Sequence, residues 1–444
     1  MKGKAIRITA LLAVCFLHAV FLQAQSKTLT LEEAIELSIR NSPQLKFSQA
    51  KIDEANAALR EANERKLPEA KVSGSYIRLN SPNIDMKSSG TGSSGGNTSA
   101  PEKISSAAYG ILNLSLPLYS GSRIRYGIES SRFLAEAAKL DAASDREQIV
   151  LNTINAFANL YKANAAMRVV REGLEGNRER VKQFTSLEKN GLLARNDLLK
   201  AELQESNTEL TLLDAENNWK LANINMNIML GLPDSTVLQP SITKWKTDES
   251  GKSIEDYLQQ ASQNRKEIAA IELRRKAAGA GIKVAKADYY PSLALTGGYI
   301  AADIPNFITI TNAANIGVGV QYSISSLWKN HSKVDQAKAR QKEIEANETM
   351  LSDDVRREVH QAYLDFTLNR QKISTYTKAV AQAEENYRIV KNKYNNALAT
   401  TTDLLDADVA QLQARLNFVF SEADASSSYS KLLYTSGILS SNSK

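Results

Sequence analysis

One acidic phrase occurs twice in the sequence, and its carboxylates are the residues whose type and spacing could do chemistry. The phrase D-L-L-x-A-[E/D] begins at Asp197 and again at Asp403. In the second copy Asp406 follows three residues later, a spacing that puts both carboxylates on one helix face. The chemistry is electrostatic, since a carboxylate in the first turn stabilises the positive end of the helix dipole. The phrase therefore marks two helix starts, with Asn196 or Thr402 as candidate caps and Gly191 ending the preceding helix.

Catalytic and metal-binding motifs are missing from the sequence. His331 and His360 both lie in helical sequence without a plausible partner motif. The sequence contains no G-x-S-x-G, no H-E-x-x-H and no phosphate loop. We therefore expect a protein that is not an enzyme, with no cofactor and no metal site.

The first 24 residues have the pattern of a signal peptide. Three cations precede an apolar run over residues 8–22, and Ala24 offers a small residue for cleavage. The only cysteine, Cys15, lies inside that run, so we expect no disulfide in the mature chain. Lipidation of Cys15 is the alternative, because the residues before it faintly resemble a lipoprotein processing site.

Charge and hydropathy limit the partners. The formal net charge of +6 includes the three signal-peptide cations. No basic patch carries interleaved aromatic residues, so we expect no nucleic-acid partner. After the signal peptide no apolar run reaches about twenty residues, the length of a membrane-spanning helix.

The acidic phrase is part of a longer internal repeat. The offset that relates Asp197 to Asp403 also relates Gly231 to Gly437. A second offset relates Asn41 to Asn264. A low-complexity insert around residues 88–102, which reads as a flexible loop, explains the change of offset.

Each copy has the order helix, strand, strand, long helix, break, long helix. We expect a first repeat over residues 25–232, a linker over 233–252 and a second repeat over 253–444. In the first repeat, Thr30 and Glu33 form a capping-box pattern at the start of the first helix. The expected long helices are 124–189, 196–230, 330–396 and 402–436, of which 124–189 and 330–396 would each be about 100 Å long. The expected strands are 68–79, 108–119, 291–301 and 315–325.

The strands alternate between apolar residues and polar or small residues. Leucine occupies every second position from Leu112 to Leu118, and apolar residues recur in the same way from Ile316 to Ile324. Alternation with a period of two gives a strand one apolar face, and nine to eleven such residues can cross a bilayer. A soluble sandwich edge is the alternative for these segments taken alone.

Barrel closure then restricts the assembly. Four strands are too few, because the smallest transmembrane barrels have about eight. An open edge is not tolerated in lipid, where every backbone N–H and C=O needs a partner. If these are membrane strands, several chains must share one barrel, and their long helices would continue it as a helical tube.

The sequence resembles the TolC-like outer membrane efflux protein family. The resemblance rests on the duplicated plan, "LTLEEAIELSIRNSPQL", "LPEAKVSGSYI", "YYPSLALTGGYI" and the two D-L-L-x-A phrases. It implies a mainly α fold with a β-barrel portion: a homotrimer with a twelve-stranded outer-membrane barrel and an α-helical tunnel across the periplasm. It also implies outer-membrane lipid, a periplasmic adaptor and an inner-membrane pump of RND or ABC type as partners.

The resemblance also assigns roles to residues at the helix breaks. Asp403 and Asp406 match two aspartates that project into the constriction at the periplasmic tip, where three chains would give two acidic rings favouring cations. Asp197 and Tyr394 match a carboxylate and a tyrosine that lock this gate. An arginine of the family's lock is replaced by Ala399.

The turns between the long helices would lie at the outermost tip. Exposed apolar residues there are candidate adaptor contacts, and the turn residues proposed for this role are Gly191, Leu192, Ala397 and Leu398. We expect an efflux duct of a tripartite system. The alternatives are a type I secretion duct and a soluble periplasmic coiled-coil scaffold.

Overall fold

The computed structural model describes residues 26–80, 105–242, 251–305 and 308–439. The expected signal peptide, Cys15 and the low-complexity insert lie outside these residues. The chain divides into two compact units. The first contains residues 1–49, 140–268 and 350–444, and the second contains residues 50–139 and 269–349. Each unit is described by itself.

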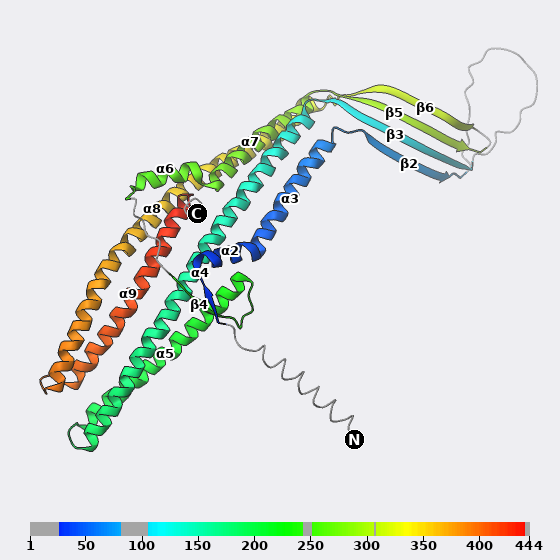
Figure 1. Ribbon diagram of the computed structural model, residues 1–444. Coiled ribbons are helices and arrows are strands. Elements are labelled where there is room, and N and C mark those ends of the chain that lie inside the picture. Colours follow the sequence, from blue (N-terminus) through cyan, green and yellow to red (C-terminus); the bar gives the residue numbers. More distant parts are fainter. Residues whose placement is uncertain (1–25, 81–104, 243–250, 306–307, 440–444) are drawn as a thin grey trace, which may run out of the picture. The chain divides into compact units, whose positions relative to one another are not determined.

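The first unit is built from two helical hairpins, which Figure 1 shows side by side with both turns at the same end. One hairpin joins α4 (Arg123–Lys189) to α5 (Arg195–Leu230), and the other joins α8 (Ser326–Asn395) to α9 (Thr401–Thr435). At 67 residues, α4 is about 100 Å long at 1.5 Å per residue. Such a helix is stabilised by neighbouring helices along its length.

Short elements pack beside the hairpins. The first repeat contributes β1 (Ser26–Leu29) and α2 (Leu31–Asn41), and β1 pairs in parallel with β4 (Val237–Pro240). The second repeat contributes α6 (Ile254–Asn264). The expected linker over 233–252 therefore contains a strand. Leu238 of this strand is fully buried with Phe157 and Leu230, so packing holds the segment in place.

The start of α2 corrects one expected detail. Thr30 caps the helix, since its hydroxyl accepts a hydrogen bond from the Glu33 backbone N–H at 3.2 Å. The Glu33 carboxylate forms an ion pair with Lys27 at 2.7 Å. The capping box is therefore half formed, because the nearby lysine attracts the carboxylate that would complete it.

The two repeats are equivalent in their packing. A side chain added at Gly231 would meet Asn41 Cβ at 3.1 Å, and one added at Gly437 would meet Asn264 Cβ at 3.0 Å. Both glycines follow the last long helix of their repeat, and each asparagine is the last residue of the short helix that opens its repeat, α2 or α6. The repeated sequence thus folds into a repeated close contact that excludes a β-carbon.

The second unit contains a four-stranded antiparallel sheet in the order β2-β3-β5-β6 (Figure 1). Its strands are β2 (Glu69–Arg78), β3 (Ser106–Ser120), β5 (Ser292–Ile304) and β6 (Ile308–Gln321). The helix α3 (Pro43–Glu64) precedes β2. The helix α7 (Lys266–Lys286) and a 3-10 turn, η2 (Ala287–Tyr289), precede β5.

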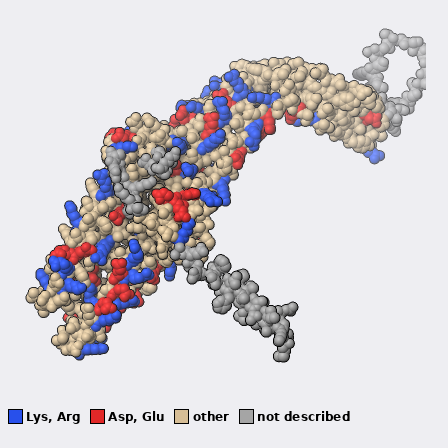
Figure 2. Space-filling model, in the orientation of Figure 1, with Lys and Arg blue, Asp and Glu red and all other residues tan. Residues whose placement is uncertain are grey.

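The strand register separates an apolar face from a polar face. Across the sheet, Val72, Leu112 and Tyr299 occupy aligned positions, as do Leu295 and Val318. Residues at the intervening positions lie on the other face, among them Ser73, Asn113, Ser115, Thr296, Gly298, Asn315 and Gly317. Figure 2 shows the charged side chains mainly over the helices, with few on the surface of the strands.

Two details of the expected alternation were wrong. A register shift between Pro117 and Tyr119 breaks the leucine series at Leu118, because the extra residue interrupts the alternation. The strand β6 covers Ile308–Gln321 instead of 315–325. Tyr322 and Ile324 therefore lie beyond the strand, where the chain turns through Ser323 and Ser326 into α8.

Candidate functional site: the helical turns and the cluster beside them

The two hairpin turns have the same backbone geometry. In the first, the Leu192 N–H donates to Leu187 O and the Gly191 N–H donates to Glu188 O, both at 2.9 Å. In the second, the Leu398 N–H donates to Lys393 O at 2.8 Å and the Ala397 N–H donates to Tyr394 O at 3.0 Å. These are Schellman motifs, which need a left-handed residue at the turn.

The left-handed position is occupied by different residues in the two turns. Gly191 has φ of 72° and Ala397 has φ of 59°. Glycine adopts this conformation freely, whereas the β-carbon of alanine makes it costly. The apolar side chains that follow are open to solvent in the described chain, with Leu192 74% and Leu398 76% exposed.

The caps of the second helices differ from the expected ones. Ala194 occupies the N-cap position of α5 and makes no side-chain cap bond, so Asn196 is not the cap. Thr400, and not Thr402, caps α9. Thr400 forms a full capping box: its hydroxyl accepts from the Asp403 N–H at 3.2 Å, and its own N–H donates to the Asp403 carboxylate at 2.8 Å. Asp403 stands at the third helical position, which makes the earlier residue the cap.

Asp403 and Asp406 lie near each other on exposed positions of α9. Hydrogen bonds from the Thr400 backbone and then from its hydroxyl lower the pKa of the Asp403 carboxyl from its usual value. Asp403 therefore carries its charge over a wider pH range than a free aspartate. The cap and an acidic field are compatible, because only one carboxylate oxygen takes part in the box.

Asp197 and Tyr394 lie in different surroundings within the described chain. Asp197 forms an ion pair with Lys200 at 3.5 Å. Tyr394 stacks on Phe184, with ring centroids 5.7 Å apart, and packs against a cluster that includes Leu198 and Leu404. The structure records no hydrogen bond between Tyr394 and Asp197 among the residues it describes.

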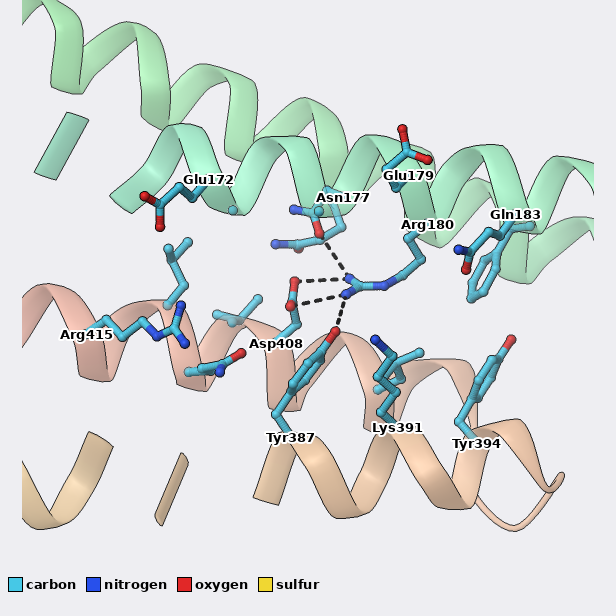
Figure 3. Close-up of a pocket in the computed structure, with 18 of the residues that line it drawn as sticks. Glu172, Asn177, Glu179, Arg180, Gln183, Tyr387, Lys391, Tyr394, Asp408 and Arg415 are labelled. Atoms are coloured by element: carbon cyan, nitrogen blue, oxygen red, sulfur yellow. Dashed lines mark hydrogen bonds and ion pairs between the residues drawn. The ribbon is translucent and has the colours of Figure 1, made fainter. Parts of the chain in front are cut away.

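A buried arginine joins the two hairpins, and the sequence analysis missed it (Figure 3). Arg180 of α4 donates in a bidentate manner to Asp408 of α9, at 3.0 and 3.1 Å. Arg180 also donates to the Tyr387 hydroxyl of α8 at 3.0 Å and to Asn177 Oδ1 at 3.0 Å. Its side chain is only 9% exposed. We call Arg180, Asp408, Tyr387 and Asn177 the arginine cluster.

Arg180 keeps its positive charge inside the cluster. Burial lowers the pKa of the Arg180 guanidinium, but the hydrogen bond and the negative charge of Asp408 outweigh burial and raise it. Asn177 extends the network to α5, because its amide donates to the Thr208 hydroxyl at 2.9 Å. Side chains from all four long helices therefore meet in one network, and the four residues of the arginine cluster line a cavity of about 320 Å³.

A second polar contact joins the hairpins closer to the turns. Lys200 of α5 donates to the Thr402 hydroxyl of α9 at 3.1 Å. Lys200 and Asp406 occupy equivalent positions of the two acidic phrases. The signal in the sequence that indicates both contacts is a difference between the repeats. Arg180 and Lys200 occupy the positions at which the second repeat has Asn386 and Asp406.

Two kinds of feature are absent from the part of the chain that the structure describes. No group of three or more His, Cys, Asp or Glu side chains there could hold a metal ion. Within the same residues, no helix combines the length and the apolar character needed to cross a membrane.

Long helical hairpins joined to a sheet with one apolar face define the TolC-like class of channel proteins. A family model described as "Outer membrane efflux protein" matches residues 34–232 and 257–435. The chain belongs to the outer membrane efflux protein family. It is therefore an outer membrane channel protein and not an enzyme, and the soluble periplasmic scaffold is excluded.

Individual relatives agree with this assignment. The cation efflux system protein CusC of Escherichia coli K12 is 25% identical over 400 residues, covering 87% of this chain and 81% of CusC. The outer membrane protein VceC of Vibrio cholerae has a similar fold, with a TM-score of 0.77 at 19% identity, covering 92% of this chain and 96% of VceC. The Campylobacter jejuni CmeC outer membrane channel gives a TM-score of 0.79 at 18% identity, covering 92% and 86%.

Proposed function

We propose that three copies of this chain form one gated exit duct of a tripartite efflux system. Their sheets close into a twelve-stranded barrel in the outer membrane, and their long helices continue it as a tunnel across the periplasm. An inner-membrane pump and a periplasmic adaptor deliver the substrate. The relatives named above, among them a cation efflux system protein, support the efflux role.

The observation that carries this proposal is the open sheet. Among the described residues, β2 pairs only with β3 and β6 pairs only with β5, so both edges are unpaired. One face of the sheet is apolar, with Ile316 82% exposed and Val72 83% exposed in the single chain. A membrane sheet needs closed edges, and pairing β6 of one chain with β2 of the next closes them.

Disulfide cross-linking between edge strands tests this closure. The only cysteine of the sequence is Cys15, so introduced cysteines have no competitor in the described residues. Ser73→Cys on β2 is combined in turn with Asn315→Cys and Gly317→Cys on β6. We expect oxidised dimers and trimers on a denaturing gel. The matched control combines Ser73→Cys with Thr296→Cys on the inner strand β5 and stays monomeric. Monomers in every combination would reject the shared barrel.

The gate of the proposed duct lies at the helical turns. Asp403 and Asp406 form its acidic rings, Asp197 and Tyr394 contribute a lock between hairpins, and the exposed Leu192 and Leu398 contact the adaptor. The lock is tested with Tyr394→Phe, which keeps the stacking on Phe184 and removes only the hydroxyl. We expect a higher resting conductance in planar bilayers. Wild-type conductance would remove Tyr394 from the lock.

The arginine cluster provides a contact between the hairpins in place of the gate-lock arginine of the family, whose position is Ala399 in this chain. Ala399 offers no charge, whereas Arg180 joins α4 to both α8 and α9. Opening the tip by moving one hairpin against the other requires these hydrogen bonds to break. We therefore assign Arg180 and Asp408 to the closed state of the gate.

A further inference from the structure

A polar cavity of about 430 Å³ lies in the second unit, where the strands meet the helices. The ends of β3 and β6, the start of β5, the turn η2, the first turn of α4 and the first eight residues of α8 contribute to its wall. Three cations line it, Arg123, Lys329 and Lys333, together with five serine residues. The volume falls in the range of about 300–1,000 Å³ that is typical of small-molecule sites.

The cavity carries more positive than negative charge. Asp288 is its single lining carboxylate. It forms an ion pair with Lys333 at 3.0 Å and a longer one with Arg123 at 3.6 Å. For Lys329 the structure records no ion pair among the residues it describes. One carboxylate thus faces three cations, and this arrangement attracts a further anion.

The strand register fixes the side of the sheet on which the cavity opens. Ser120, Ser292 and Gln321 line the cavity and are aligned across β3, β5 and β6 on the polar face. Ile324 and Trp328 near the same junction are each 64% exposed and do not line the cavity, whereas Tyr290 is the one large aromatic residue in its lining. The cavity is therefore continuous with the polar face.

We propose that this cavity binds the phosphoryl group of a small phosphorylated solute. A phosphoryl group carries up to about two negative charges and three acceptor oxygens, which suits the three cations of the cavity. Arginine and lysine are the usual partners of such groups. The location inside the duct rests on the proposed function, since only barrel closure turns the polar face inward. Binding of the phosphoryl group requires only the cavity and does not depend on barrel closure.

Calorimetry on the purified, detergent-solubilised protein tests the binding, with glycerol 3-phosphate as the probe at low salt. We expect saturable binding that Lys329→Gln weakens about tenfold, because one charge-assisted hydrogen bond is lost. Lys329→Arg should restore it, since the charge is kept. Lys342→Gln removes an exposed lysine of the same helix outside the cavity and serves as the matched control. Equal affinity in Lys329→Gln and in the control would overturn the proposal.

A second arm separates a soluble ligand from a lipid headgroup. Native mass spectrometry compares retention of glycerol 3-phosphate with retention of an anionic phospholipid, in the wild type and in Lys329→Gln. Lysine-dependent retention of the lipid alone would overturn the soluble-ligand assignment. In planar bilayers, glycerol 3-phosphate should reduce the current of the wild type but not of Lys329→Gln. A protein that binds the probe but forms no channel would reject the proposed duct and leave the site intact.

Discussion

At the scale of single residues, Arg180 is a buried cation that depends on its partners. A guanidinium that is 9% exposed must be paired, because an unpaired buried charge is costly. Asp408, Tyr387 and Asn177 satisfy it from three directions. The energetic value of the cluster therefore lies less in net attraction than in the cost of breaking it. Such a contact favours one arrangement of the hairpins over all others.

Arg180→Met tests this role. Removing the guanidinium leaves the Asp408 carboxylate unpaired, so we expect a loss of about 2 kcal/mol in unfolding free energy, below the usual cost for a fully buried pair because Asp408 is 22% exposed. Resting conductance should rise as well. The measurements are urea unfolding and planar-bilayer recording. Lys182→Met, which removes an exposed lysine two positions later that pairs with Glu179 of the same helix, is the control and should change neither value by much.

Asp406 separates the electrostatic role of the acidic phrase from its capping role. The carboxylate of Asp403 belongs to the capping box, whereas Asp406 lies outside it. Asp406→Asn should therefore lower cation selectivity without disturbing the start of α9. Reversal potentials in a salt gradient measure the selectivity. Thr400→Ala is the complementary variant, since it loses the cap and keeps both charges. An unchanged reversal potential in Asp406→Asn would argue against the acidic rings.

The pKa of Asp403 predicts how the cap responds to pH. Its folded-state pKa is depressed, so its stabilising contribution is present above the unfolded pKa. The contribution is lost as the pH falls through the folded value. The cap should thus persist into mildly acidic solution, where an ordinary aspartate begins to take up a proton.

At the scale of elements, the two hairpin turns differ in one backbone cost. Ala397 holds the left-handed conformation that Gly191 adopts without strain. Ala397→Gly should stabilise the second turn by up to about 1 kcal/mol, and Gly191→Ala should destabilise the first by a similar amount. Thermal unfolding of the two variants gives the comparison. A loss of stability in Ala397→Gly would mean that the entropy of the unfolded chain outweighs the strain.

Comparison of the expected and observed helices and strands shows which of them the sequence predicts. Helical and alternating periodicities, read twice because the chain is duplicated, predict the long helices and the apolar face of the sheet. The start of β6 escapes such analysis. Residues 308–311 alternate isoleucine with threonine, but Asn312, Ala313 and Ala314 interrupt the pattern, and pairing with β5 continues the strand through them.

The arginine cluster escapes for a related reason. Arg180 and Asp408 are distant in the sequence, and no local pattern links them. Helix caps escape because several adjacent residues compete for one position. Thr400 is the cap because Asp403 lies three residues after it. The acidic phrase thus predicts where the long helices break but not the hydrogen bonds formed there.

At the scale of the whole molecule, we expect the apolar face of the sheet to be the surface that contacts lipid in the outer membrane. Ile316→Lys places a charge on that face, and Asn315→Lys places the same charge on the polar face one residue away. We expect Ile316→Lys to cost about 2–4 kcal/mol in a bilayer and to reduce the trimer recovered from outer membranes. Asn315→Lys should assemble normally. Fractionation followed by native mass determination compares them, and equal yields would contradict a lipid-facing position for Ile316.

The unequal halves of the repeat have a consequence for stoichiometry. A threefold assembly of a duplicated chain is a quasi-equivalent ring of six hairpins, in which the position of Lys200 alternates with that of Asp406 around the rim. Its six seams are of two kinds: three within chains, fastened by Arg180 and Asp408, and three between chains. A partner that occupied every seam would need six copies in two distinct environments. In the proposed trimer, duplication followed by divergence would thus let one gene encode two classes of docking position on a single rim.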